Sequence, residues 1–228
     1  MVPQYVVKDI NLAPYGMEKL EWAYRNMPVL RAIEQELIEE QPFAGLKISV
    51  SVHVEAKTAC LARALARGGA DVALTGCNPL STQDDVAAAL AATGMHVYAV
   101  HGANEQEYIE HLKMALSFKP DIVIDDGGDF AILLHSDLSD LVPNLLGGCE
   151  ETTTGVHRLE ILEKENKLAY PVVAVNDARC KHLFDNRFGT GQSVWTAIMS
   201  ITNLVVAGKT VVVAGYGMCG RGVAMRAK

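Results

Sequence analysis

The stretch LKISVSVHVEAKTACLARALARGGADVALT, Leu46–Thr75, contains two kinds of local pattern. Apolar runs of strand length, Leu46–Val52 and Ala70–Thr75, stand at its two ends, and Lys57–Arg67 between them is typical of a helix. Strands that are buried on both faces and alternate with helices imply a parallel sheet covered on two sides. The stretch therefore predicts an α/β fold.

The same alternation continues along the chain. Further strands are expected at His96–Val100, Asp121–Ile124 and Pro171–Val175. A helix is expected at Met17–Glu40, with a break at Met27–Pro28. Two more helices are expected at Thr82–Ala92 after a Ser81 cap and at Glu105–Leu116 after an Asn104 cap. We therefore expect residues 1–185 to form one doubly wound parallel-sheet domain.

A second domain is expected to begin near the C-terminal end. Residues 186–207 are predicted to form a helical connector, and a strand at Lys209–Ala214 is predicted to run into GYGMCG, Gly215–Gly220. The first two glycines of such a turn permit a close approach to a pyrophosphate, and the third lets helix and strand pack closely. Residues 208–228 are therefore expected to start a Rossmann NAD-binding domain, and the alternative is a plain strand–helix turn in another doubly wound sheet.

The position of the last residue adds an expectation. The acidic residue that separates NAD from NADP falls about 20 residues after the glycines, which is beyond Lys228. Lys228 also comes barely two turns into the expected helix. We therefore expect the chain to be the front part of a longer enzyme, and expect this part alone to bind NAD poorly and to be inactive.

The composition argues against several classes of protein. A net charge of −7 and a pI near 5.5 are atypical of proteins that bind nucleic acids or membrane surfaces. No apolar run approaches the about 20 residues that span a bilayer, and the start MVPQYVVKD lacks a signal-peptide pattern. The five cysteines form no CxxC pair, so neither a disulfide framework nor a metal site is expected. We expect a cytoplasmic protein.

The segment VNDARCKHLFDNRFGTGQS, Val175–Ser193, is rich in polar residues that can carry chemistry. Lys181 stands four residues before Asp185, which places the two side chains on one face of an α-helix. An amine held in this way can take up and return a proton. Beside a nicotinamide cofactor, the pair suggests oxidation of an alcohol carbon.

Other polar residues follow the ends of expected strands, which form the ligand-binding edge of an open α/β sheet. We expect Asp126 to be functional, and we interpret Asp125 and Asp129 as a solvated turn in which Asp129 caps the next helix. His53 follows the first strand of the opening stretch, although a lone histidine is more often structural. The segments CEETTTG, Cys149–Gly155, and CNPLSTQDD, Cys77–Asp85, fit helix caps as well as ligand contacts.

Several segments resemble the S-adenosylhomocysteine hydrolase family, in the family's order and over essentially the whole chain. They are AYRNMPVLRAI (23–33), NPLSTQD (78–84), IDDGGD (124–129), EETTTGVHRL (150–159), VNDARCKHLFDN (175–186) and VVVAGYGMCGRG (211–222). The resemblance implies reversible hydrolysis of S-adenosylhomocysteine to adenosine and homocysteine with tightly held NAD. Because C5′ of the substrate is unactivated, the ribose is first oxidised at C3′, which acidifies the C4′ proton. Homocysteine is then eliminated, water adds, and the hydride is returned.

The resemblance also implies roles for individual residues. Lys181, hydrogen-bonded to Asp185, would be the base for the 3′-hydroxyl. Asp126 would take or return the C4′ proton, and Glu151 would bind the ribose hydroxyls. His53 would act on the leaving group and on the incoming water at C5′. Further substrate contacts would be Glu55 and Thr58. Cofactor contacts would be Thr152, Thr153, Thr154, Asn186, Gly215, Gly217, Met218, Cys219, Gly220, Arg221 and Gly222. No metal is implied, and the family forms homo-oligomers, tetramers at full length.

Two departures from the family bear on specificity. Thr190 stands where many members have cysteine, which we expect to tune the redox balance without loss of the chemistry. Glu55 and Lys57 stand where other members have neutral polar residues, a pattern that looks like the archaeal and thermophilic-bacterial branch. Some members of that branch prefer the inosine analogue, so adenosine and inosine both stay open.

Two other functions are compatible with parts of the sequence. A hydroxyacid dehydrogenase also couples a substrate domain to a later Rossmann domain, but it does not explain Lys181, Asp185 and Asn186. A truncated, non-catalytic paralogue would hold a ligand or a partner subunit through its substrate domain. Net NADH production would indicate the former, and adenosine binding without NADH formation the latter.

Overall fold

The computed structural model describes residues 2–228, which form two units. The first unit extends to Val173 and the second covers Ala174–Lys228. The sequence-based division at residues 185 and 207 stays a prediction. Within residues 2–228, no helix combines the length and the apolar character needed to cross a membrane.

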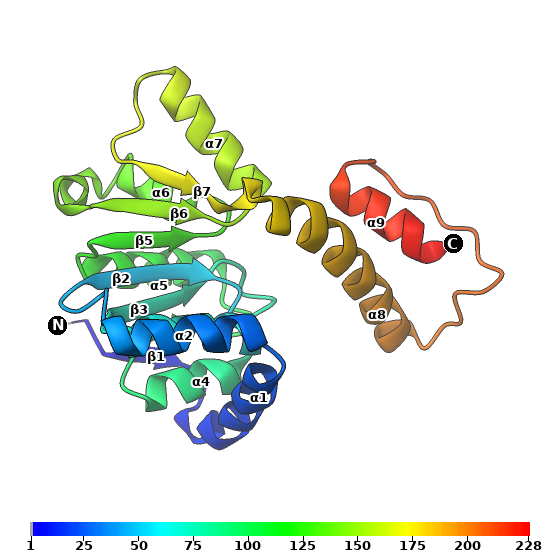
Figure 1. Cartoon of the computed structure of the whole chain (residues 1–228), viewed down its shortest axis with the longest axis horizontal. Helices are drawn as coiled ribbons and strands as arrows, with labels where there is room; N and C mark the ends of the chain where they lie inside the picture. The colour runs from blue at the N-terminus through cyan, green and yellow to red at the C-terminus, as the bar shows by residue number, and fades with distance from the viewer. Residues whose placement is uncertain (1) are drawn as a thin grey trace. The chain divides into compact units, whose positions relative to one another are not determined.

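The first unit is built on a sheet of seven strands, which Figure 1 shows one above another. The strands are β1 (Tyr5–Val7), β2 (Lys47–Val52), β3 (Asp71–Gly76), β4 (His96–Ala99), β5 (Ile122–Asp125), β6 (Gly147–Glu150) and β7 (Val172–Ala174). Their spatial order is β1-β4-β3-β2-β5-β6-β7. The pairs from β1–β4 to β5–β6 are parallel, which confirms the predicted α/β class.

The direction of strand progression reverses between β2 and β5. From β2 the chain proceeds to β3 and β4 on one side, and then returns so that β5 pairs with the other edge of β2. In this pair Val50 lies opposite Ile124. Open α/β sheets bind ligands outside the carboxyl ends of the strands at such a reversal.

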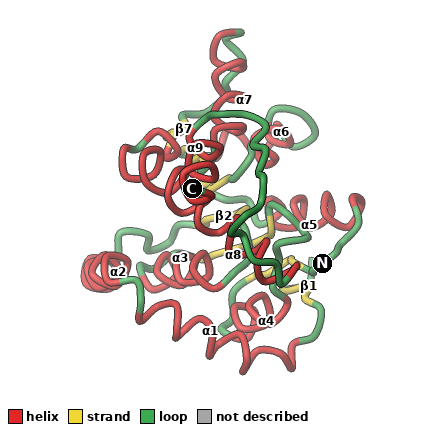
Figure 2. Tube along the Cα trace, turned by 90° about the vertical axis from the view of Figure 1, so that its right-hand side faces the viewer, coloured by secondary structure: helices red, strands yellow, loops and turns green. Residues whose placement is uncertain are grey.

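Helices cover both faces of the sheet (Figure 2). They are α1 (Ala13–Arg25), α2 (Pro28–Glu40), α3 (Ala56–Arg67), α4 (Asp84–Ala92), α5 (Glu105–Ser117), α6 (Asp129–Leu134) and α7 (Thr153–Lys164), with short 3-10 turns η1 (Ile10–Leu12) and η2 (Ser139–Asn144). One core lies between the sheet and the helices α1, α3 and α4, and a second core includes residues of α5 and α6. The unit is therefore a three-layer sandwich.

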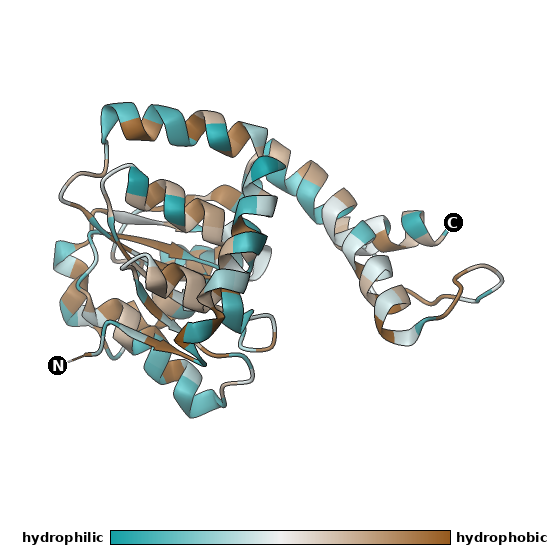
Figure 3. Cartoon of the chain, turned by 90° about the horizontal axis from the view of Figure 1, so that it is seen from below, coloured by the Kyte–Doolittle hydropathy of each residue, from teal (hydrophilic) through white to brown (hydrophobic). Residues whose placement is uncertain are grey.

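Strand β2 shows how the sequence specifies these layers. Its valines Val50 and Val52 belong to the first core, whereas Ser49 and Ser51 alternate with them and are also fully buried. The hydroxyl of Ser49 donates a hydrogen bond to the carbonyl of Ala115 in α5, 2.7 Å away. Small hydroxyl side chains thus occupy the face that meets α5. Figure 3 shows hydrophobic residues along the strands and hydrophilic residues on the outer helices.

Several boundaries differ from the predictions. The strands β1 and β6 were not predicted, because Tyr5–Val7 is short and GGCE in β6 has little β propensity. The predicted Ser81 cap is wrong, since α4 begins at Asp84 after the extended residue Gln83. By contrast, Asn104 does cap α5, through a capping box with Glu107.

The second unit contains four helical segments. They are η3 (Val175–Asp177), the π-helix η4 (Lys181–Gly189), α8 (Thr190–Thr202) and α9 (Met218–Ala227). Part of the connector predicted at residues 186–207 is helical: α8 begins at Thr190 and ends at Thr202, and Asn203 follows it in a left-handed conformation. The strand predicted at Lys209–Ala214 is wrong. Within the described residues this segment has no strand assignment, because a strand forms only where a neighbouring backbone pairs with it.

Candidate functional site

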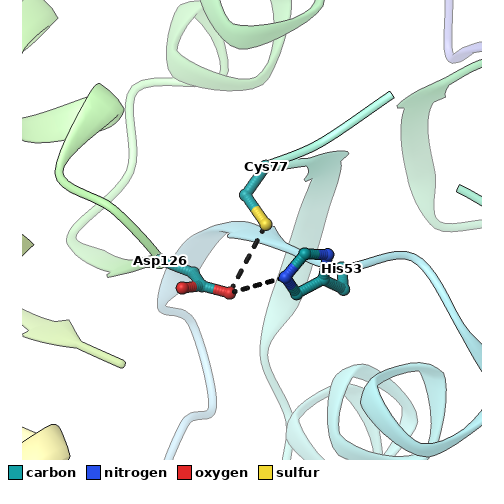
Figure 4. A group of neighbouring side chains, drawn as sticks. All are labelled: His53, Cys77 and Asp126. Atoms are coloured by element: carbon teal, nitrogen blue, oxygen red, sulfur yellow. Dashed lines mark hydrogen bonds and ion pairs between the residues drawn. The ribbon is translucent and has the colours of Figure 1, made fainter. Parts of the chain in front are cut away.

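Three candidate residues each follow the carboxyl end of a strand at or beside the reversal of strand order. His53 comes directly after β2, Asp126 after β5, and Cys77 after β3. Because β3, β2 and β5 are neighbours in the sheet, the residues meet although 24 and 49 positions separate Cys77 from the other two. Figure 4 shows their side chains pointing toward one another. Their position is the one in which α/β sheets bind ligands.

The carboxylate of Asp126 is the centre of this group. Its Oδ2 atom lies 3.6 Å from Nε2 of His53 and accepts a hydrogen bond from the thiol of Cys77, whose sulfur is 3.4 Å away. Asp126 is largely buried, with 13% of its side chain exposed, whereas 47% of the His53 side chain is exposed. The buried acid is thus placed to exchange a proton with an imidazole that solvent or a ligand can reach.

The orientation of His53 is set by the loop after β3. Its Nδ1 atom lies 2.6 Å from Oγ of Ser81, and the Ser81 hydroxyl in turn donates to the carbonyl of Asn78 at 2.9 Å. Since a hydroxyl has one proton to donate, Ser81 must accept from Nδ1–H of His53. In the neutral imidazole this leaves the lone pair on Nε2, the nitrogen that faces Asp126.

Cys77 was not singled out from the sequence. Burial raises the pKa of its thiol well above the ordinary value, and the neighbouring carboxylate of Asp126 raises it further, so Cys77 is a hydrogen-bond donor at neutral pH. The signal available in the sequence was its position directly after a predicted strand, as for His53 and Asp126.

Two further carboxylates are buried beneath the group. Asp125 ends β5 and accepts hydrogen bonds from the backbone N–H groups of Asp126 and Ala131. Burial raises the pKa of Asp125 to about 8. The expectation of a solvated turn capped by Asp129 is therefore wrong: Asp125 supplies the buried acceptor for α6, and Asp129 accepts from the Tyr108 hydroxyl at 2.7 Å.

Glu150 lies opposite Asp125 in the sheet register and is fully buried. Its Oε1 atom accepts from the N–H groups of Gly127 and Thr152, each at 2.9 Å, and so ties the loop after β5 to the loop after β6. Burial raises the pKa of Glu150. A β-carbon at Gly155 would lie 2.1 Å from its carboxyl carbon, so the glycine makes room for the acid. From the sequence, Glu150 stood within the candidate segment Cys149–Gly155 without a role of its own, because the strand that it ends was not predicted.

The remaining candidates of the first unit lie at helix starts. Glu55 is the N-cap of α3, where its carboxylate accepts from the N–H groups of Lys57 and Thr58, and the Thr58 hydroxyl donates to the carbonyl of His53. Glu151 follows β6, and Thr152, Thr153 and Thr154 form the start of α7. The N-terminal end of a helix favours anionic ligand groups.

In the second unit, Lys181 makes hydrogen bonds with two side-chain amides. Its amine donates to Oδ1 of Asn176 at 3.1 Å and to Oδ1 of Asn186 at 3.0 Å. Asn176 and Asn186 are buried, whereas Asp185 is exposed. The predicted hydrogen bond from Lys181 to Asp185 is replaced here by the bond to Asn186. In a π-helix the repeat is five residues instead of four, so the side chain five positions on shares a face with Lys181.

The glycines after residue 214 form a tight turn that leads into α9. Gly215 has a φ of +93°, which favours glycine, and Gly217 is the N-cap of α9. A β-carbon at Gly222 would lie 1.9 Å from the carbonyl oxygen of Arg187, so this glycine allows α9 to pack on η4. No atom lies within 4 Å of a β-carbon built at Gly215 or Gly217, which leaves open space beside the turn.

The chain is similar to known proteins over nearly its whole length. A family model described as S-adenosyl-L-homocysteine hydrolase matches residues 4–145 and 137–214. The chain belongs to the S-adenosyl-L-homocysteine hydrolase family. Members of this family with similar sequences include an S-inosyl-L-homocysteine hydrolase from Methanocaldococcus jannaschii, 60% identical over 224 residues, and one from Methanococcus maripaludis, 57% identical over 221 residues. An adenosylhomocysteinase from Pyrococcus abyssi is 54% identical over 224 residues.

These matches cover nearly all of the chain but only part of each relative. They include 98%, 97% and 98% of the chain, and 54%, 53% and 53% of the three relatives in the same order. The chain thus spans about half the length of the curated relatives it matches. The resemblance inferred from the six sequence segments is confirmed.

Proposed function

We propose that the chain supplies the purine-riboside side of a hydrolase that cleaves the thioether of S-adenosyl- or S-inosyl-L-homocysteine. The observation that carries this proposal is the pairing of His53 with Asp126 across the strand reversal, 3.6 Å apart. A thioether carbon is a poor electrophile, so cleavage needs a proton to be removed from the neighbouring carbon. A buried carboxylate beside an accessible imidazole provides both a base and a second proton carrier.

Each residue then has one task in the proposed reaction. Lys181 accepts the proton of the 3′-hydroxyl, and the amides of Asn176 and Asn186 hold its amine. Asp126 removes the C4′ proton after the ribose has been oxidised. His53 gives a proton to the departing homocysteine sulfur and takes one from the water that replaces it. Glu151 accepts hydrogen bonds from the ribose hydroxyls, and Asp185, Glu55 and Thr58 complete the proposed substrate contacts.

The turn of the second unit is suited to NAD. The open space beside Gly215 and Gly217 and the N-terminus of α9 would admit a pyrophosphate, with further contacts from 218–222, Asn186 and 152–154. When bound, NAD takes up and returns the hydride of ribose C3′. We also propose that the enzyme is a homo-oligomer, which light scattering would measure.

The second candidate substrate is S-inosyl-L-homocysteine, which the names of two similar relatives favour. The relatives with 60% and 57% identity are named S-inosyl-L-homocysteine hydrolases, and the adenosylhomocysteinase has 54%. Exchange of the adenine amino group for the hypoxanthine carbonyl turns a donor into an acceptor. A site built for one purine is therefore expected to reject the other.

A chimera tests the proposed function directly. The part of the Methanocaldococcus jannaschii relative that follows the matched region would be joined after Lys228, and the product loaded with NAD. We expect release of homocysteine from S-adenosyl- or S-inosylhomocysteine, and transient NADH absorbance with no net NADH accumulation. Net NADH from a 2-hydroxy acid would support the dehydrogenase instead. Nucleoside binding without NADH formation would support a non-catalytic module.

A further inference from the structure

The group at the strand reversal has the composition of a transition-metal site. His53, Cys77 and Asp126 offer one nitrogen, one sulfur and one oxygen atom, all within 4.8 Å of one another. Imidazole and thiolate ligands favour Zn²⁺ and related ions, whereas Mg²⁺ and Ca²⁺ prefer oxygen atoms alone. The three residues come from three separate strand ends, so their spacing in the sequence does not indicate a metal site.

Two of the three distances between these atoms match those around a tetrahedral zinc ion, and the third, from Nε2 of His53 to Sγ of Cys77, is at most 4.8 Å. With Zn–N and Zn–O distances of about 2.1 Å and a Zn–S distance of about 2.3 Å, two ligand atoms of a tetrahedron stand about 3.4–3.6 Å apart. Here Nε2 of His53 is 3.6 Å and Sγ of Cys77 is 3.4 Å from Oδ2 of Asp126. An ion could therefore enter with small side-chain movements.

The surrounding hydrogen bonds also favour a cation. Ser81 accepts from Nδ1–H of His53, which leaves Nε2 as the free nitrogen of the neutral ring. Metal-bound histidines are commonly held in this way through the other ring nitrogen. The thiol of Cys77 already points its proton at Asp126. A metal ion would take the place of that proton.

The geometry points to a site for a thiophilic divalent cation such as Zn²⁺, bound by Nε2 of His53, Sγ of Cys77 and Oδ2 of Asp126. On binding, the Cys77 thiol gives its proton to solvent, the metal–sulfur bond forms, and no oxidation occurs. The fourth position of the tetrahedron remains for water. If the proposed function holds, the ion occupies the two groups that move protons at C4′ and C5′, and it therefore inhibits the enzyme.

Cobalt(II) is the probe for binding, because its absorption reports both thiolate ligation and tetrahedral geometry. The 228-residue chain carrying Cys180→Ser and Cys219→Ser, which removes the two exposed thiols, would be titrated with Co²⁺ and then with Zn²⁺. We expect one equivalent to produce a thiolate-to-cobalt charge-transfer band that Zn²⁺ abolishes. Absence of the band in this chain would overturn the site.

Matched variants locate the ligands. Cys77→Ser should lose the band, whereas Cys149→Ser, which removes another partly buried thiol, should keep it. A band that survives Cys77→Ser would contradict the assignment. Ser81→Ala keeps all three ligands and should weaken cobalt binding about 10–100-fold. Unchanged affinity in Ser81→Ala, in a folded protein, would contradict the proposed orientation of His53.

The inhibitory effect is measured separately, on the NAD-loaded chimera. Zn²⁺ should stop homocysteine release, and Cys77→Ser should raise the inhibitory concentration at least about 10-fold, since one of three ligands is lost. Equal inhibition of both proteins would overturn the inhibitory role. A chimera without any activity would contradict the proposed function and leave the cobalt result standing by itself.

Discussion

The amine of Lys181 donates a hydrogen bond to Oδ1 of Asn186, 3.0 Å away and five residues further along the π-helix η4. Asn186 also donates from its Nδ2 atom to Asn176, which accepts from Lys181 as well. Two side-chain amides therefore help to position the lysine.

Asn186→Ala should destabilise the second unit. It removes an acceptor from Lys181 and a donor from Asn176 in a buried position, and we expect a loss of about 1–3 kcal/mol in the free energy of unfolding. In a Trp22→Phe background, urea unfolding followed by fluorescence reports on Trp195, which lies in this unit. Asp185→Ala is the control and should leave the midpoint unchanged, since Asp185 is exposed. Equal effects of the two substitutions would contradict the amide network.

Lys181→Arg should abolish the oxidation step in the NAD-loaded chimera. Arginine keeps the charge but does not release its proton, so it cannot accept one from the 3′-hydroxyl. We expect the rate of NADH formation from nucleoside to fall about 10²–10⁴-fold, with nucleoside binding retained in calorimetry. Lys57→Arg, at an exposed position, should have no effect. A Lys181→Arg enzyme of normal rate would assign the proton to another group.

The buried carboxyl of Asp125 should make stability fall as the pH rises. The unfolded chain ionises an aspartate near pH 4, whereas burial raises the pKa of Asp125 in the folded chain to about 8. Between these values the folded state holds one more proton, so this group lowers the free energy of unfolding by up to about 1.4 kcal/mol per pH unit. Urea unfolding by circular dichroism at pH 5 and pH 8 measures the fall.

Asp125→Asn is the matched variant for this pH dependence. It cannot ionise, so the decrease in stability between pH 5 and pH 8 should shrink, and the remainder should come from groups such as Glu150, whose pKa is also raised by burial. The same decrease in the wild-type chain and in the variant would show that Asp125 is already ionised at pH 5.

Gly155→Ala should destabilise the first unit, although alanine is normally the better helix residue. The new β-carbon would lie 2.1 Å from the carboxyl carbon of Glu150, and such overpacking costs about 1–3 kcal/mol. Urea unfolding measures this loss. In the double variant Glu150→Ala/Gly155→Ala the clash is absent, so its cost should be smaller than the sum of the two single costs. Additive costs would rule out the clash.

The main strands and two site residues could be predicted because their signals are local. Val50 and Leu74 stand in short, mainly apolar runs that are typical of buried strands, and His53 and Asp126 follow such runs directly. Cys77 was missed because its partners lie across the sheet, and pairing between neighbouring strands is a property of the fold. Asp185 was taken as the partner of Lys181 because a period of four was assumed, and the local π-helix changes that period to five.

The carboxyl ends of β2, β3 and β5 each contribute one residue to the group of His53, Cys77 and Asp126. Helices connect these strands on the outside, so substitutions, insertions or deletions there leave the triangle of side chains intact as long as the ladder of backbone hydrogen bonds keeps its register. Only a slip of one strand against the next, by a single residue, would turn one member of the trio to the opposite side of the sheet.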